Sequence, residues 1–485
     1  MINLKTIFRV LGSLLMIEAV LMSLCTIMAF YYGEDDSFAF IITVVFTMIV
    51  GLTLQLLGRN ADNNMARRDA YLVVTLSWII FSIFGMLPFL ISGYITNLSS
   101  AFFETMSGFT TTGATIIDDV EALPHGLLFW RSMTQWIGGL GIVFFTIAIL
   151  PSFVGGSVKV FAAEATGPIK TRLHPRLSTN AKWIWTIYLI LTVGCWLSFW
   201  GAGMSLFDSV NYSMTTTATG GFATHNSSTE FFLSPTIEYI NTLFCFLSGV
   251  NFTLLYISVV KMKPLSIWKS SEFKFYLAMI AGFTVFIMVE LMVRNSYELE
   301  KAFRCAIFQV VSFITTTGLF NDDAGTWPHV TWVVLAACMF FGACSGSTSG
   351  GLKSIRGVML LKVIKNEFTQ LLHPNAVLPM KVDGVNVPSQ QRVTLLAFLT
   401  IYLMICLLSS FLLIASGIDN TNAITIILSC IGNVGPTLGL EIGPTMSWSE
   451  LPDYIKWFCS ILMLIGRLEI FSVLVIFTPT FWKER

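Results

Sequence analysis

Charged residues are scarce in this sequence of 485 residues. Asp, Glu, Lys and Arg together make up 12% of it, about half the share in a typical soluble domain. The five histidines are far apart, and none of the nine cysteines belongs to a C-x-x-C pair. These absences argue against a metal site built on histidine and cysteine and against a disulfide framework. The formal net charge is zero, so bulk charge suggests no nucleic-acid partner.

Apolar residues, by contrast, are abundant. Hydrophobic residues make up 55% of the chain and aromatic residues 14%, and the mean hydropathy is +0.75. A soluble protein of this length needs far more polar surface, so the composition predicts a membrane protein in a lipid bilayer. The first apolar run, from Val10 to Tyr32, is too long for a signal-peptide core, and no small-residue cleavage site follows it. We therefore expect it to be a retained membrane helix.

The apolar runs come in two lengths. A helix needs about 20 apolar residues to cross the hydrocarbon core of a bilayer. Runs of that order lie near residues 8–32, 37–57, 71–94, 126–151, 182–203, 236–260, 274–294, 328–362, 393–416 and 453–479. Shorter runs lie near residues 99–112, 205–217, 298–314 and 420–432. Because the shorter runs cannot cross, we expect each to be a re-entrant helix buried among the others.

Basic residues are unevenly distributed between the two sides that these spans define. Most of the 28 lysines and arginines fall before residue 8, at 58–70, 152–181, 261–274 and 353–392, after residue 480, or at the adjoining helix ends. The exceptions are Arg131, Arg294, Lys301, Arg304, Lys456 and Arg467. The positive-inside rule makes this side cytoplasmic, with both termini on it. The opposite side is acidic, which can concentrate cations there; its acidic residues are Glu104, Asp118, Asp119, Glu121, Asp208, Glu230, Asp322, Asp323, Asp419 and Glu441.

The four short runs end in similar motifs. They read Ser107-Gly-Phe-Thr-Thr-Thr-Gly113, Ser213-Met-Thr-Thr-Thr-Ala-Thr-Gly220, Ser312-Phe-Ile-Thr-Thr-Thr-Gly318 and Ser429-Cys-Ile-Gly-Asn-Val-Gly435. Counting back from the last glycine aligns them, with one extra residue in the second motif. Each motif lies between two long runs, so the repeating unit is helix, re-entrant helix, polar loop, helix.

The repeats define the predicted fold class. We expect an all-α polytopic membrane protein in which four fused helix–re-entrant pore helix–helix repeats surround a central pore. The predicted units are two N-terminal transmembrane helices at 1–70 and pore repeats at 71–180, 181–272, 273–391 and 392–485.

Such repeats suit the conduction of a cation. A short helix that ends within the membrane directs its C-terminal carbonyl groups and partial negative charge at one point. Carbonyl groups in the loop that follows can replace the water around a permeating cation, and glycine permits the backbone turns that this requires. One such motif alone would more simply be a helix C-cap in an external loop. Four copies at matching positions favour the pore.

On these motifs the sequence resembles the Trk/Ktr family of bacterial potassium-uptake channel subunits, over essentially its whole length. The two extra N-terminal helices resemble those of the Trk branch. The resemblance implies uptake of potassium ions, as substrate, across the bacterial inner membrane, with no enzyme activity and no organic cofactor. It also implies a homodimer and a cytoplasmic nucleotide-binding regulator similar to TrkA. The exposed basic segments 152–181 and 363–391 are the expected docking surfaces for that regulator.

The resemblance also assigns a selectivity filter to the four loops. Its residues are Thr111, Thr112, Gly113, Ala218, Thr219, Gly220, Thr316, Thr317, Gly318, Asn433, Val434 and Gly435. The fourth repeat lacks the threonine-rich pattern, and the longer T-V-G-Y-G signature of tetrameric channels is absent. We therefore expect only moderate selectivity for potassium.

The second long run of repeat three contains a segment rich in glycine and serine, Gly342-Ala-Cys-Ser-Gly-Ser-Thr-Ser-Gly-Gly351. Glycine costs about 1 kcal/mol in a helix interior, so we expect the helix to break here, and in no other second helix. The segment is either a cytoplasmic loop or an intramembrane loop beneath the filter. The resemblance favours an intramembrane gate, with residues Gly342, Cys344, Ser345, Gly346, Ser347, Thr348, Ser349, Gly350, Gly351 and Arg467.

Three charged residues lie inside predicted spans. Arg467 is either half of a structural ion pair or a pore residue below the filter, where it repels cations or holds the glycine-rich loop through its carbonyls. For Glu18 and Glu290 we expect interhelical hydrogen bonds. For Gly138-Gly-Leu-Gly141 we expect close helix packing.

Two other functional classes remain as alternatives to a channel. A secondary transporter that couples potassium to protons or sodium would also contain broken helices and intramembrane charges. However, such transporters usually line the path with acidic residues, and no such series is present in the predicted spans. A membrane-embedded enzyme would need a cluster of His, Asp and Glu within the spans, and the sequence shows none.

Overall fold

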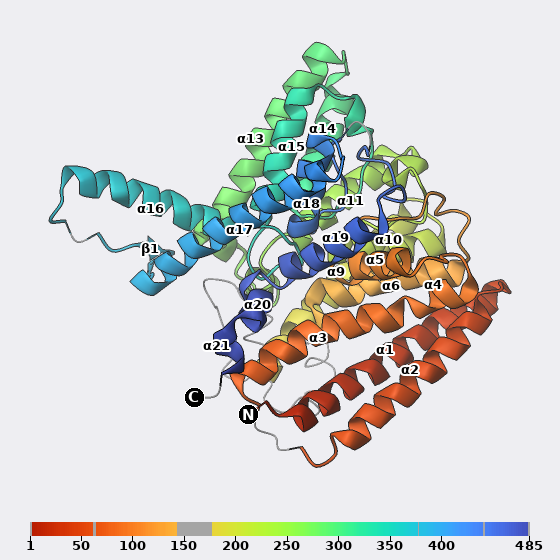
Figure 1. Ribbon diagram of the computed structural model, residues 1–485. Helices are drawn as coiled ribbons and strands as arrows, with labels where there is room; N and C mark the ends of the chain where they lie inside the picture. Colours follow the sequence, from red (N-terminus) through yellow and green to blue (C-terminus); the bar gives the residue numbers. More distant parts are fainter. Residues whose placement is uncertain (1, 62–64, 143–176, 377, 440–441, 484–485) are drawn as a thin grey trace.

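The computed structural model describes residues 2–61, 65–142, 177–376, 378–439 and 442–483. The regular secondary structure of these residues is helical apart from one small antiparallel hairpin of β1 (Lys381–Val382) and β2 (Val385–Asn386) (Figure 1). Six helices of the described residues are long and apolar enough to cross a membrane, or up to eight if two bent helix pairs count as spans. The all-α polytopic fold predicted from the sequence is confirmed.

The two N-terminal helices, α1 (Leu4–Tyr32) and α2 (Ser37–Leu57), form an antiparallel pair at one side of the bundle (Figure 1). They approach closely because Gly12 and Gly51 face each other: a Cβ on Gly12 would lie 2.6 Å from the carbonyl oxygen of Gly51. The loop between α1 and α2 caps the N-terminus of α6 (His125–Leu140). Glu34 accepts a hydrogen bond from the His125 N–H at 2.6 Å, and Asp36 accepts one from the Leu127 N–H at 3.1 Å.

The repeats follow in the order that the sequence predicts. The first helices of the four repeats are α3 (Arg67–Gly85) with α4 (Leu87–Ser92), then α9 (Leu177–Gly201), α13 (Ser271–Arg294) and α17 (Ser389–Ala415). The short pore helices are α5 (Leu98–Phe109), α10 (Leu206–Ala218), α14 (Leu299–Ile314) and α18 (Asn420–Gly432). The second helices are α6 (His125–Leu140), α11 (Pro235–Ser248), α15 (His329–Phe341) and α19 (Asp453–Arg467).

Long and short helices differ in burial. Only 28% of the apolar window is buried in α9 and in α17, which is the pattern of helices that face lipid. The C-terminal halves of the pore helices are buried almost throughout, as the sequence predicts, while their first turns include exposed residues. Three of them begin at a side-chain cap in which Asn97, Ser205 or Asp419 accepts a hydrogen bond from a first-turn backbone N–H.

Within the described residues three of the four second helices break, whereas the sequence predicted a break in repeat three alone. Helix α11 meets α12 (Phe252–Val259) at an angle of 103°, and α19 meets the segment Phe471–Phe477 at 109°. Helix α6 ends before Gly141, whose φ is +90°, and the rest of the span predicted for it lies outside the described residues. In repeat three, α15 and α16 (Ser354–Leu372) flank the predicted loop. In repeat two the break begins at Gly249, whose carbonyl accepts a hydrogen bond from the Cys344 N–H of repeat three, whereas the break in repeat four, at residues 468–470, contains no glycine.

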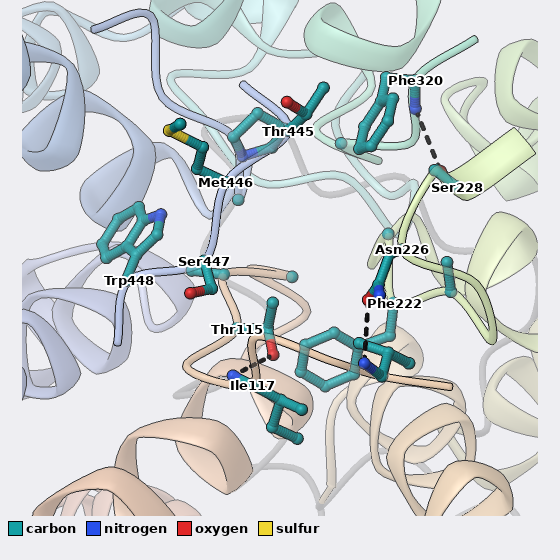
Figure 2. A pocket seen from close by; sticks show the side chains of 18 of the residues that line it. Thr115, Ile117, Phe222, Asn226, Ser228, Phe320, Thr445, Met446, Ser447 and Trp448 are labelled. Carbon is teal, nitrogen blue, oxygen red and sulfur yellow. Dashed lines mark hydrogen bonds between the residues drawn. The ribbon is translucent and has the colours of Figure 1, made fainter. Parts of the chain in front are cut away.

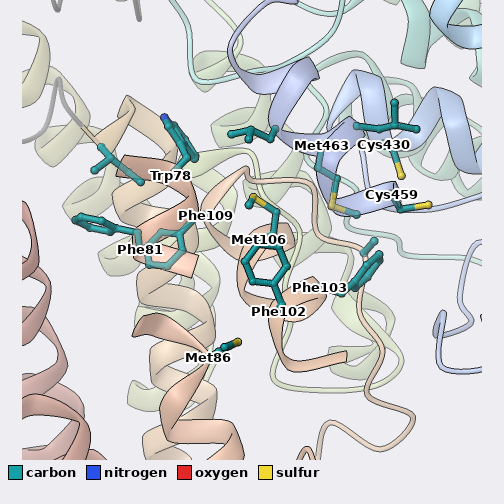
Figure 3. Packing of buried hydrophobic residues seen from close by; sticks show 14 of the residues in the cluster. Trp78, Phe81, Met86, Phe102, Phe103, Met106, Phe109, Cys430, Cys459 and Met463 are labelled. Atoms are coloured by element: carbon teal, nitrogen blue, oxygen red, sulfur yellow. The ribbon is translucent and has the colours of Figure 1, made fainter. Parts of the chain in front are cut away.

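The repeats close into a ring. Each second helix packs against the pore helix of the following repeat: α6 on α10, α11 on α14, α15 on α18, and α19 back on α5. Figure 3 shows the closing contact, where Phe103 and Met106 of α5 share a core cluster with Cys459 and Met463 of α19. This closure gives the four pore helices a common centre.

The remaining elements are short helical segments of three to six residues. They are η1 (Ser228–Phe232), η2 (Pro264–Lys269), η3 (Ala324–Thr326), α20 (Phe471–Leu474), η4 (Val475–Phe477) and α21 (Pro479–Trp482). Helix α16 and the β1–β2 hairpin project from the bundle (Figure 1), and the hairpin and the second half of α16 belong to the predicted docking segment 363–391. Three sequence predictions fall outside the described residues. They concern the end of the span 126–151, the segment 152–181 apart from its last residues, and Glu441.

Candidate ion-conduction site

The chain makes the same turn after each pore helix. The residues Thr111, Thr219, Thr316 and Asn433 have φ values of +53°, +54°, +58° and +55°. Two residues later come Gly113, Gly221, Gly318 and Gly435, with φ of +81°, +85°, +77° and +99°. Threonine rarely adopts positive φ because it is β-branched, and backbone strain of this kind concentrates at functional sites. Four identical turns therefore indicate one shared function.

The turn corrects the predicted alignment of repeat two. The N–H after the strained residue donates to a carbonyl oxygen five residues back: Thr112 to Ser107 at 2.9 Å, Thr317 to Ser312 at 2.8 Å, and Val434 to Ser429 at 3.0 Å. In repeat two, Gly220 donates to Thr215 at 2.9 Å. Thr215 thus takes the place assigned to Ser213, and there is no extra residue. The matching set is Thr219, Gly220 and Gly221, while Ala218 ends the pore helix.

The four turns touch one another in cyclic order. A Cβ added to Gly113 would overlap the carbonyl oxygen of Gly220, and one on Gly221 would overlap that of Thr317. In the same way, Gly318 lies against the carbonyl of Val434, and Gly435 lies against that of Thr112. Each glycine therefore faces a carbonyl oxygen of the following repeat. The ring admits no side chain at these four positions, which is the physical reason for glycine there.

Side chains behind the turns hold them in place. The amide of Asn433 donates to the Thr112 hydroxyl at 3.0 Å and to the Met463 carbonyl at 2.9 Å, so it ties repeat four to repeat one. Gln135 of α6 donates to the Gly220 carbonyl at 2.7 Å and accepts from the Phe222 N–H at 3.0 Å. Asn433, which stands where the other repeats have threonine, thus connects the turns of repeats four and one by a hydrogen bond. Gln135 was missed because nothing in an apolar helix distinguishes a supporting amide from any other.

A cavity opens above the ring. Its lining includes the four turn glycines and residues of all four repeats, and Figure 2 shows Thr115, Phe222, Phe320 and Trp448 around it. Asp118, His225 and Asn226 make part of the wall polar. His225 stacks on Phe231 with 3.5 Å between ring centroids.

The ionisable groups of this outer cavity are coupled. His225 Nδ1 lies 3.3 Å from Glu121 and Nε2 lies 3.5 Å from Asp208. Burial alone would lower the pKa of His225, but its hydrogen bonds to Asp208 and Glu121 and their charges raise that pKa above its ordinary value. Burial would raise the pKa of Asp208, yet hydrogen bonds from His225, Thr224 and Ser205 lower it.

The glycine-rich segment of repeat three lies on the other side of the ring, inside the bundle. The N–H of Gly350 donates to the Thr316 hydroxyl at 2.7 Å. The Thr348 hydroxyl lies 3.1 Å from the Thr217 carbonyl and 3.3 Å from that of Ser248. A Cβ on Gly350 would overlap the carbonyl of Gly432. The loop therefore packs against the ends of three pore helices.

The rest of the segment is anchored to α13, to the break between α11 and α12, and to the start of α12. Glu272 of α13 accepts from the Ser345 N–H at 2.5 Å, from the Ser345 hydroxyl at 3.1 Å, and from the Ile355 N–H at 3.1 Å. The backbone N–H of Cys344 donates to the Gly249 carbonyl at 3.0 Å, and the Ser347 hydroxyl donates to the Cys344 carbonyl at 2.6 Å. Two more backbone carbonyls of the segment are bound: that of Gly346 accepts from the Phe252 N–H, and that of Ser349 accepts from the Lys353 ammonium group. Gly342, Gly346 and Gly351 have positive φ.

Arg467 binds this loop through a backbone carbonyl. Its Nη1 donates to Thr348 at 2.9 Å, and its Nη2 donates to Gly138 at 2.6 Å and to Gly139 at 2.8 Å. One guanidinium thereby connects repeat four to the loop of repeat three and to the end of α6 in repeat one. The predicted close packing at Gly138-Gly139 is present as well, since a Cβ on Gly139 would lie 2.7 Å from the Tyr188 hydroxyl.

A second basic residue secures the segment beyond Arg467. Arg356 of α16 forms an ion pair with Glu469, and its guanidinium lies 4.0 Å from the Phe398 ring centre. Glu469 and Ile470 both have positive φ, at +52° and +59°. Glu469 was not assigned a role from sequence, because the partner lies far away in the chain.

Two predicted interhelical contacts are absent from the part of the chain that the structure describes. Glu18 is fully buried in α1, and neither of its carboxyl oxygens has a hydrogen-bond partner there. Glu290 pairs with Arg294 at 2.8 Å on its own helix, one turn away. Neither residue touches the ring of turns through a recorded hydrogen bond.

Comparison with known proteins accounts for this geometry. Residues 36–484 match the TrkH family of cation transport proteins. The chain belongs to the TrkH family. It is 35% identical over 484 residues to the Trk system potassium uptake protein TrkH of Halomonas elongata, covering 99% of this chain and 100% of that one. It is 36% identical to TrkH of Escherichia coli K12, covering 99% of each chain.

A solved TrkH family structure shares the fold. The crystal structure of the potassium transporter TrkH from Vibrio parahaemolyticus superimposes with a TM-score of 0.89 at 34% identity, covering 99% of both chains. The resemblance inferred from the four motifs is thus confirmed over essentially the whole length. The relatives are transport proteins rather than enzymes by name.

Proposed function

We propose that this chain is the membrane subunit of a Trk-type potassium uptake system and conducts potassium ions through the ring of four turns. The observation that carries the proposal is the cyclic contact of each turn glycine with a carbonyl of the next repeat. A ring of backbone carbonyls can replace the hydration shell of a cation. The ion-binding residues are the predicted set, with Thr219, Gly220 and Gly221 in repeat two.

The loop of repeat three is the gate in this proposal. It blocks the inner side of the ring, where Thr348 and Gly350 bind residues at the pore-helix ends. Arg467 holds it there by its bond to Thr348. The small side chains from Gly342 to Gly351 let the loop withdraw without clashes.

The names of the relatives support a Trk-type system around the subunit. We propose that the chain lies in the bacterial inner membrane with both termini in the cytoplasm, and the distribution of basic residues supports this orientation. A homodimer, a TrkA-like cytoplasmic regulator and the unit boundaries given above complete the proposal. The transported ion is the substrate, and no enzyme reaction is involved.

Ion flux into liposomes tests the function. The purified protein should pass potassium down its gradient and discriminate against lithium and sodium, with no need for a proton or sodium gradient. If potassium flux stops when both other gradients are clamped, the protein is a coupled secondary transporter. If lithium and potassium pass equally well, the potassium assignment is wrong.

External pH should modulate the flux through His225. Protonation below its raised pKa adds positive charge to the outer cavity, so potassium flux should fall about twofold as external pH drops from 8 to 6. Replacing His225 with Gln should remove this pH dependence. His329, at the start of α15, provides the control, because His329→Gln should keep the pH dependence of the wild type. An unchanged pH profile in His225→Gln would contradict the prediction.

A further inference from the structure

The gate and the ring leave one buried ion pair beside the filter unexplained. Glu104 of the pore helix α5 and Arg131 of α6 lie 2.9 Å apart, with side chains only 1% and 2% exposed. Buried charges are costly, and removal of one partner leaves the other uncompensated. The pair therefore needs a reason beyond fold stability.

Glu104 binds the chain just past the repeat-one turn. Both of its carboxylate oxygens lie 3.0 Å from the Thr115 hydroxyl, and one accepts from the Ile116 N–H at 3.0 Å. Thr115 and Ile116 follow Gly113 by two and three residues. The Thr115 hydroxyl also accepts from the Ile117 N–H at 3.1 Å (Figure 2). The carboxylate thus fixes the outer end of this turn.

Arg131 makes the matching contact to repeat two. Its Nη1 donates to the Ala223 carbonyl at 3.1 Å, two residues after Gly221, and its Nη2 donates to Thr115 at 3.3 Å. Its guanidinium lies 4.2 Å from the Phe222 ring centre. Gln135, one turn along α6, binds Gly220 and Phe222. The pair therefore spans the outer ends of two adjacent turns, whose glycines both line the cavity with Arg131.

The other repeats fill the position of Glu104 differently. Tyr212 stands there in repeat two and donates to the Ser228 carbonyl at 2.9 Å. Gln309 stands there in repeat three and donates to the Asp322 carbonyl at 3.1 Å. Repeat four has the apolar Ile426. Three of the four positions thus hold the loop beyond the turn, and only the first does so with a charge.

We propose that Arg131 and Glu104 are positioning residues that set the width of the outer filter between repeats one and two, and thereby the preference for potassium over sodium. The inference rests on the proposed function and deepens it. As a pair they add no net charge at the cavity wall, so Arg131 fixes the turns without repelling the ion. A looser span would let the carbonyls close around a smaller cation.

The decisive variant is Arg131→Lys. Lysine keeps the charge but loses the planar fork that contacts Glu104, Thr115 and Ala223 together. In liposomes with potassium on one side and sodium on the other, the potassium-to-sodium permeability ratio should fall about fivefold or more, the size expected when hydrogen bonds that hold a binding loop are lost. Thr115→Val, which removes only the hydroxyl, should shift the ratio in the same direction by less.

Controls separate the possible outcomes. Arg294→Lys alters an exposed ion pair on α13 and should leave the ratio unchanged. If the wild-type protein itself shows no selective passive flux, the proposed function fails. If the wild type is selective and both Arg131→Lys and Thr115→Val keep its ratio, the positioning role alone is overturned. If Arg131→Lys does not purify as a folded protein, the ratio of Thr115→Val decides.

Discussion

Gly113→Ala should reduce potassium flux by at least about tenfold. Left-handed backbone costs an L-residue roughly 1–2 kcal/mol, and a change of about 1.4 kcal/mol corresponds to tenfold in an equilibrium constant. In addition, the new Cβ would overlap the Gly220 carbonyl, so the ring must widen or that carbonyl must turn away. Gly113→Asp should abolish flux altogether. Flux is measured in liposomes with purified protein at equal density.

Gly93→Ala is the matched control for this prediction. Gly93 has the same φ of +81°, but a Cβ there would have no neighbour within 4 Å. It therefore carries the backbone strain without the clash in the ring. Flux near the wild-type level in Gly93→Ala and loss in Gly113→Ala would assign the effect to the ring. Equal flux in all three proteins would show that the ions do not pass between these turns.

Arg467→Ala should increase potassium flux in the absence of any regulator. It removes charge-assisted hydrogen bonds to Thr348, Gly138 and Gly139, and such bonds contribute about 1.5–3 kcal/mol each. Because these bonds hold the loop against the inner side of the ring, a loss of that size should raise the open fraction by about tenfold or more. The measurement is the initial rate of flux in liposomes containing the subunit alone.

Two further variants show what the effect means. Arg467→Lys keeps the charge but cannot hold three carbonyls at once, so it should give an intermediate rate. Arg294→Ala, at an exposed position, should leave the rate unchanged. A lower rate in Arg467→Ala, in protein that elutes as the wild type does, would mean that the arginine supports the open path and is not a latch.

Much of this architecture could be predicted from the sequence because membrane constraints are strong. The length of apolar runs separates spanning helices from re-entrant ones, and four glycine-terminated motifs at matching places predict a ring. The register of repeat two could not be predicted in the same way. Its segment reads Thr215-Thr-Thr-Ala-Thr-Gly220-Gly221, so threonine and glycine fit two registers equally well. The structure distinguishes them by the backbone bond from Gly220 to Thr215 and by the positive φ of Thr219 and Gly221.

The breaks in the other second helices were missed for a different reason. One glycine costs a helix about 1 kcal/mol, which does not by itself end an apolar span. The breaks have tertiary partners instead: in repeat two the Cys344 N–H donates to the Gly249 carbonyl, and in repeat four Arg356 pairs with Glu469. Glu272 and Arg356 were missed likewise, since their partners lie on other elements.

The most direct test of the central claim is anomalous diffraction from crystals soaked with thallium(I), which has the charge and nearly the size of potassium. Anomalous density should lie on the axis of the ring formed by the carbonyls of Thr112, Gly220, Thr317 and Val434, and should disappear in crystals of Gly113→Asp. Strong thallium density elsewhere in the bundle, with none within this ring, would contradict the assignment of these four turns as the ion-conducting filter.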